Sequence, residues 1–135
     1  MRIFSTAILE LNANLCLLFT RIIIGAFTLS HGLPKLYQFT SGQEIKFADP
    51  LGFGPEVSMG LVVFAEVGCA ILIILGFGTR LASIPLMINM GVAAFMAHAN
   101  DPFGTKEKPL LFLIIFIILF VFGSGKYSID RLIAK

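Results

Sequence analysis

Pro55–Gly76, with the sequence PEVSMGLVVFAEVGCAILIILG, is the stretch that decides the fold. A helix rises about 1.5 Å per residue and roughly 20 residues cross the hydrocarbon core, so this stretch is about one bilayer thickness long. One carboxylate, that of Glu66, lies near its middle. An isolated charge at that depth costs on the order of 3 kcal/mol. The stretch therefore predicts a membrane-spanning helix that needs a cationic partner from elsewhere in the chain.

The composition of the whole chain agrees with this prediction. Of the 135 residues, 57% are hydrophobic and 13% are charged, whereas soluble domains carry about 25% charged residues. The length suits one domain, residues 1–135. A net charge of +2 without a basic stripe argues against nucleic-acid binding. We therefore expect a single-domain integral membrane protein whose immediate partners are membrane lipids.

Four apolar runs predict an all-α bundle of four transmembrane helices, at approximately residues 11–33, 56–76, 81–97 and 109–124. Pro34 is expected to end the first helix, because the residue before a proline is pushed out of the α region. Pro109 is expected in the first turn of the fourth helix, where a missing N–H costs little. Residues 34–55 mix charged and aromatic side chains, which predicts a surface segment between helices 1 and 2.

Four spans place both termini on the same side of the membrane. The basic residues outside the spans divide five to four in favour of that side, which favours a cytoplasmic location for both termini. The side with the termini carries Arg2, Arg80, Lys126, Arg131 and Lys135, and the other carries Lys35, Lys46, Lys106 and Lys108.

Three polar residues are expected to meet at mid-membrane. Arg21 lies at a depth in the first helix similar to that of Glu66 in the second, and Asn89 lies near the middle of the third. A guanidinium can grip a carboxylate with two N–H groups. Gly25 and Gly32 follow on nearly the same face as Arg21 and allow another helix to approach closely. We predict a buried Arg21–Glu66–Asn89 centre, which either fixes the helix register or forms a cavity for a polar ligand, a headgroup or a proton.

A second group of polar residues lies at the helix ends opposite the termini. His31 and Lys35 end the first helix and His98 ends the third, so they are candidates for the rim of an outer pocket. Two histidines at one level could ligate haem or a metal ion, but helix capping explains them more simply, and no metal site is predicted. Cys16 and Cys69 lie inside apolar runs and form no CxxC pair, so redox-active thiols are not expected.

Several short motifs follow one another along residues 17–132. They are Arg21 with Gly25, His31-Gly32-Leu33-Pro34-Lys35, Ala65-Glu66 with Gly68, Leu75-Gly76-Phe77-Gly78-Thr79-Arg80, Ala93-Ala94 with His98, and Gly123-Ser124-Gly125-Lys126-Tyr127-Ser128-Ile129-Asp130. In this order and spacing they resemble the DoxX family of small four-helix bacterial inner-membrane proteins. The resemblance implies that the protein is related to the small thiosulfate:quinone oxidoreductase subunits. It also suggests a link to thiol redox and oxidative stress, because some members of the family are linked to complexes of that kind.

The resemblance and the predicted polar centre lead to two main hypotheses about function. The first is an accessory subunit of a membrane complex linked to quinone, thiol or sulfur redox chemistry, with other membrane subunits or a second copy as partners. No cofactor motif would make the chain an oxidoreductase by itself, so any thiosulfate or thiol:quinone activity is expected only within a complex. The alternative is a binding or transport module in which the Arg21–Glu66–Asn89 centre holds a small ligand, a quinone or a lipid. Quinone is the one cofactor that either hypothesis suggests.

Overall fold

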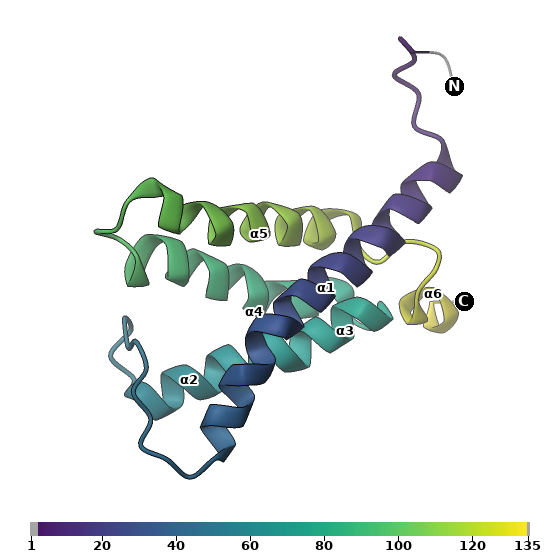
Figure 1. Ribbon diagram of the computed structural model, residues 1–135. Helices are drawn as coiled ribbons and strands as arrows, with labels where there is room; N and C mark the ends of the chain where they lie inside the picture. The colour runs from purple at the N-terminus through teal and green to yellow at the C-terminus, as the bar shows by residue number, and fades with distance from the viewer. Residues whose placement is uncertain (1–2, 135) are drawn as a thin grey trace.

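In the computed structural model, residues 3–134 are described, and they form helices and loops without a strand (Figure 1). Arg2 and Lys135, two of the basic residues behind the expected topology, lie outside this range. The elements in chain order are α1 (Glu10–Thr40), α2 (Pro55–Val63), the π-helical turn η1 (Phe64–Cys69), α3 (Ala70–Leu75), α4 (Thr79–Val92), the π-helical turn η2 (Ala93–Ala97), α5 (Phe103–Phe122) and α6 (Ile129–Ile133).

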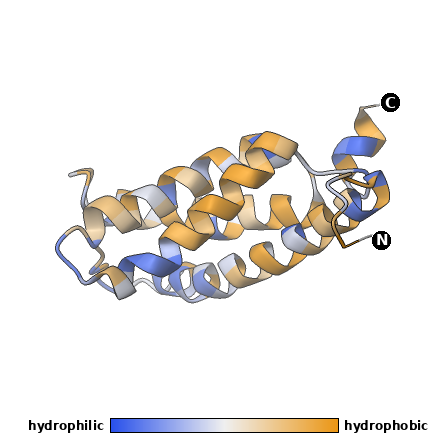
Figure 2. Cartoon of the chain, turned by 90° about the horizontal axis from the view of Figure 1, so that it is seen from above, coloured by the Kyte–Doolittle hydropathy of each residue, from blue (hydrophilic) through white to orange (hydrophobic). Residues whose placement is uncertain are grey.

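The helices pack as a rod, a diagonal helix and a hairpin. The rod consists of α2, η1 and α3, which follow one another without a break, and α1 crosses it along its length. The α4–η2 segment and α5 lie side by side as the hairpin (Figure 1). Both termini lie at the same end of the bundle (Figure 2). The core between these parts is formed mainly by Ile24, Ala65, Cys69, Ile73, Ala82, Leu86, Met90, Phe116 and Leu119.

Much of the outer surface is also apolar, as the orange helix faces in Figure 2 show. Three helices in the described part of the chain are long and apolar enough to cross a membrane: Glu10–Thr40, Pro55–Leu75 and Thr79–Ala97. The fourth predicted span corresponds to α5, whose first two turns carry Lys106, Glu107 and Lys108. A four-span topology therefore stays a prediction, whereas the all-helical membrane fold is confirmed.

Two expected helix boundaries at prolines are wrong. α1 runs through Pro34 to Thr40, and α5 begins at Phe103, so that Pro109 lies inside it. A proline inside a helix removes one hydrogen bond, but membrane helices tolerate it because neighbouring groups satisfy the freed backbone. The two extra turns of α1 place Lys35 beside the rod formed by α2, η1 and α3. The contact of Lys35 with Glu66 of the rod stabilises these two turns. Residues 42–54 contain no helix and form a loop back to α2.

Candidate ligand-binding site

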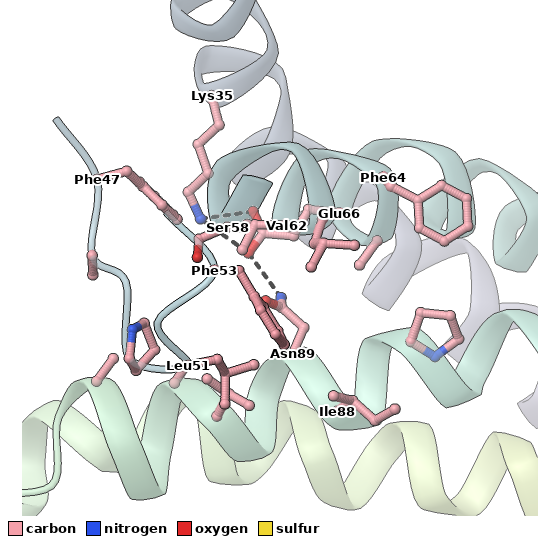
Figure 3. A pocket seen from close by; sticks show the side chains of 18 of the residues that line it. Lys35, Phe47, Leu51, Phe53, Ser58, Val62, Phe64, Glu66, Ile88 and Asn89 are labelled. Carbon is pink, nitrogen blue, oxygen red and sulfur yellow. Dashed lines mark hydrogen bonds and ion pairs between the residues drawn. The ribbon is translucent and has the colours of Figure 1, made fainter. Parts of the chain in front are cut away.

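The carboxylate of Glu66 is bound by two side chains from different helices. Lys35 Nζ on α1 donates to both carboxylate oxygens, at 3.0 Å to Oε1 and 2.8 Å to Oε2. Asn89 Nδ2 on α4 donates to Oε1 at 3.1 Å (Figure 3). Glu66 itself is 5% exposed, while 32% of the Lys35 side chain is exposed. An ion pair and an amide thus stabilise a carboxylate at the centre of the bundle. The predicted contact between Glu66 and Asn89 is confirmed.

Arg21 does not contact Glu66, so the predicted Arg21–Glu66 pair is wrong. Its guanidinium donates instead to backbone carbonyls at the end of α3 and in the segment after α5, which are those of Ile73, Ile74, Ser124 and Tyr127. The C-terminal end of a helix carries partial negative charge, which favours a cation there. Arg21 is 1% exposed, and its role in the fold is to join α1 to these two segments.

The helix register explains why the prediction chose the wrong cation. α1 crosses the rod at Gly32, where a Cβ atom would lie 2.8 Å from the backbone of Glu66. Gly32 is 11 residues beyond Arg21, which is about 16 Å along a helix. Gly25 makes a similar close approach to Ile74, so the prediction that these two glycines allow close packing is confirmed.

Sequence analysis could have found Lys35 as the partner of Glu66. Arg21, Thr28 and Lys35 are spaced seven residues apart and therefore share one helix face. The pattern was hidden because Pro34 was expected to end the helix one residue earlier.

A cavity of about 560 Å³ opens beside this ion pair (Figure 3). Its polar lining includes Lys35, Ser58, Glu66, Asn89 and His98. The rest is mainly aliphatic and aromatic and comes from three parts of the chain: the 42–54 loop, the rod, and the α4–η2 segment. These lining residues are Phe47, Ala48, Pro50, Leu51, Phe53, Leu61, Val62, Phe64, Ala65, Pro85, Ile88, Val92, Ala93 and Ala97.

Both π-helical turns contribute to the cavity wall. η1 carries Glu66, and η2 ends immediately before His98. A π-helical turn is less stable than an α-helical one and is found frequently at functional sites. The two turns therefore independently mark the same region as the candidate site.

The model of the family "DoxX" matches residues 16–99, which is more than half of the chain and includes Lys35, Glu66, Asn89 and His98. The chain belongs to the DoxX family. It is an integral membrane protein, as the family and its apolar helices together show.

Three curated relatives of this DoxX chain show what it is similar to. Inner membrane protein YqjF of Escherichia coli K12 is 29% identical over 122 residues, which cover 87% of this chain and 92% of the relative. Inner membrane protein YphA of the same organism is 30% identical over 125 residues, covering 85% and 88%. An uncharacterized protein of Haemophilus influenzae is 28% identical over 95 residues, and the match spans only 63% of its length. No solved structure matches the chain.

The outer-pocket residues predicted for this DoxX protein are only partly brought together. Lys35 and His98 line the cavity, and His98 Nδ1 lies 2.7 Å from Asp101 Oδ2 at its rim. His31 is not among the lining residues, and its ring meets that of Phe112 edge-on at 6.4 Å between centroids. Among residues 3–134, no group of three histidine, cysteine or acidic side chains could hold a metal ion.

The 42–54 loop is fixed over the DoxX cavity by Asp49. Its Oδ1 accepts from the Ser58 hydroxyl at 2.7 Å, and its Oδ2 accepts from the Gly54 N–H at 2.9 Å. These hydrogen bonds, that of Ser58 above all, lower the pKa of the Asp49 carboxyl below its ordinary value. Sequence analysis placed Asp49 and the aromatic residues of this loop in a surface segment, but it did not place them over a cavity, because no local pattern shows that a loop folds back in this way.

The closing motif of the DoxX chain acts at the other end of the bundle. Asp130 accepts hydrogen bonds from the N–H groups of Gly78 at 2.7 Å and Thr79 at 3.1 Å, and its own N–H donates to the Gly76 carbonyl at 2.9 Å. Asn14 Oδ1 accepts from the Lys126 N–H at 2.8 Å. The motif therefore ties α1, α3 and α4 together and does not contribute to the cavity.

Proposed function

We propose that this protein binds a small, uncharged amphipathic molecule of the lipid phase in the 560 Å³ cavity. The observation that carries the proposal is an apolar cavity lined by the Lys35–Glu66 ion pair, in which the two charges neutralise each other. Its volume lies within the range of about 300–1,000 Å³ that is usual for small-molecule sites. Lys35 and Glu66 balance each other, so a ligand with a net charge would find no counter-charge from this pair.

The head of the ligand has a hydrogen-bonding partner in Asn89. The Nδ2 group of Asn89 is bound to Glu66, while its Oδ1 atom accepts no hydrogen bond within residues 3–134. This oxygen can accept from a ligand hydroxyl, and Lys35 Nζ can donate to a ligand carbonyl. A quinol head has hydroxyl groups that can donate to Asn89 Oδ1, whereas the carbonyls of a quinone head only accept and can be bound by Lys35 Nζ. An apolar tail of either form suits the Phe53 and Phe64 side chains of the wall.

The ligand would reach the cavity sideways from the bilayer. Leu61, Phe64 and Ile88 line the cavity, yet they are 51%, 58% and 59% exposed. Side chains that face both the cavity and the outside mark an opening between the rod and α4. In a membrane this opening faces lipid, so a lipid-soluble ligand needs no aqueous path.

Binding of decylubiquinol, the reduced form whose hydroxyl groups can donate to Asn89 Oδ1, to the purified protein in nanodiscs tests the proposal. Asn89→Leu removes the free oxygen and is expected to weaken binding about tenfold, the loss that one hydrogen bond of about 1.4 kcal/mol would give. Ala93→Leu fills the cavity and is expected to weaken binding by excluding the ligand. Ala26→Leu is the matched control, because Ala26 lies on the exposed face of α1. Unchanged affinity in both cavity variants, or an equal loss in the control, would contradict the proposal.

The accessory role suggested by the sequence is a second proposal: the protein would be a subunit of a complex linked to quinone, thiol or sulfur redox chemistry. Family membership supports it, and a quinone site would suit such a complex. Co-purification from native membranes, followed by identification of the partners, is the test. An oxidation of thiosulfate or thiols by quinone in the presence of the purified chain alone would contradict an accessory role.

We also propose that α5 is a fourth span and that the protein lies in the bacterial inner membrane with both termini in the cytoplasm. α5 is uniformly apolar from Leu110 to Phe122, and two relatives are named inner membrane proteins. In a variant without native cysteines, Gly42→Cys should react with an impermeant reagent from the periplasm and Lys126→Cys should not. The same reactivity at both sites would exclude four spans.

A further inference from the structure

A second cavity lies at the end of the bundle that carries the termini. It has a volume of about 360 Å³ and is formed where α4 begins, α5 ends and α6 returns. Its charged lining residues are Arg80, Asp130 and Arg131. Neither arginine lies within 4 Å of a carboxylate among residues 3–134. Both Asp130 oxygens accept from backbone N–H groups of the turn. The cavity therefore has a positive balance of one charge.

The surroundings of Arg80 hold its guanidinium in place, which preorganises the cavity for an anion. Arg80 Nη2 donates to the Val121 carbonyl at 3.3 Å, and Gly123, with φ of 78°, leaves room for its guanidinium, since a Cβ there would lie 3.2 Å from Arg80 Nε. The Thr79 hydroxyl oxygen is fully buried and has no hydrogen-bond partner in the described part of the chain. Thr79 is among the residues that line this cavity, but it is 0% exposed, so its hydroxyl lies behind the cavity wall.

The apolar part of the lining indicates what kind of anion fits. Leu81 is 75% exposed and Phe122 is 65% exposed, and both line the cavity next to the arginines. Apolar side chains beside guanidinium groups at the end of a membrane bundle match an acyl chain next to a phosphate. Arginine is well suited to phosphate because its planar N–H groups bind two oxygens at once.

We propose that this second cavity binds the phosphate headgroup of an anionic phospholipid. Arg80 and Arg131 hold the phosphate oxygens, and Leu81 and Phe122 contact the acyl chains. The site is distinct from the 560 Å³ cavity at the opposite end of the bundle. It does not depend on the ligand proposed for that cavity.

Native mass spectrometry in micelles that contain equal amounts of phosphatidylglycerol and phosphatidylcholine tests this inference. The wild-type chain is expected to retain phosphatidylglycerol about tenfold more often, and Arg80→Gln or Arg131→Gln should remove that preference. Thr79→Val should keep the preference, because the Thr79 hydroxyl is fully buried and does not reach the headgroup. Should Arg80→Gln not fold, Arg131→Gln decides, since its guanidinium makes no hydrogen bond within residues 3–134.

Two control variants separate this site from general surface charge. Lys126→Gln removes an exposed cation at the same end, and Lys106→Gln removes a half-buried cation, bound to the Ala99 carbonyl, at the opposite end. Both should keep the preference for phosphatidylglycerol. Equal retention of the two lipids by the wild type, or a loss in the Lys126 variant as large as in the arginine variants, would overturn the inference. Displacement of the lipid by millimolar inorganic phosphate would likewise overturn it and assign the cavity to a soluble anion.

Discussion

The ion pair between Lys35 and Glu66 should appear as strong coupling in a double-mutant cycle. The variants are Lys35→Met, Glu66→Gln and their combination, each close in size to the residue it replaces. A second cycle combines Arg21→Leu with Glu66→Gln. The first cycle measures the Lys35–Glu66 contact, which is present at 2.8 Å. The second measures the Arg21–Glu66 contact, which the similar depth of the two charges in the sequence predicts.

The exposure of the two side chains sets the expected magnitudes. Removing one partner of a buried pair costs about 3–5 kcal/mol. Lys35→Met leaves Glu66, which is 5% exposed, with Asn89 alone, so we expect about 3 kcal/mol. Glu66→Gln leaves a lysine whose side chain is 32% exposed and can extend toward water, so we expect about 1 kcal/mol. The double variant should lose about 2 kcal/mol, which is a coupling of about 2 kcal/mol.

The free energies can be measured by reversible unfolding in mixed micelles, followed by circular dichroism. The Arg21–Glu66 cycle should be additive within about 0.5 kcal/mol, as for residues without a shared contact. A coupling below about 0.5 kcal/mol between Lys35 and Glu66 would refute the reasoning. So would a larger coupling in the Arg21–Glu66 cycle than in the Lys35–Glu66 cycle.

Three further predictions follow from single contacts. Gly32→Ala should destabilise the fold by about 1–3 kcal/mol, because its Cβ would lie 2.8 Å from the backbone of η1. Gly91→Ala should stabilise the fold by about 0.5 kcal/mol, because its Cβ would meet no atom within 4 Å and alanine favours a helix. Equal melting temperatures of the two variants would contradict this. Because the pKa of Asp49 is lowered in the folded protein, its anchoring of the loop is present above the ordinary value of 3.8 and lost as the pH falls through the lowered value. The protection of residues 42–54 against hydrogen exchange, measured relative to the intrinsic exchange rate at each pH, should therefore fall at acid pH in the wild type, and Ser58→Ala should weaken this pH dependence; protection that does not change with pH would argue against it. Asp130→Ala should cost about 1–2 kcal/mol, since two N–H groups at the start of α4 lose their acceptor; a change below about 0.3 kcal/mol in thermal unfolding would exclude this role.

The sequence by itself determined the class of fold and the packing face of the first helix. Apolar runs of bilayer length admit only helices here, because backbone groups in lipid must be satisfied within each segment. The glycines at 25 and 32 recur at heptad spacing, and the structure uses both for close approach. The sequence also showed that Glu66 needs a partner, since a carboxylate in the middle of an apolar run is costly without one.

Only the tertiary structure decided which cation pairs with Glu66 and where a cavity forms. The choice between Arg21 and Lys35 depends on the register of two antiparallel helices, and that register depends on whether α1 continues past Pro34. The local preference against a helix at that point is weak, and contacts with the rod outweigh it. The cavity needs the 42–54 loop, η1 and the α4–η2 segment together. These are distant in sequence, so no local pattern of residues records their meeting.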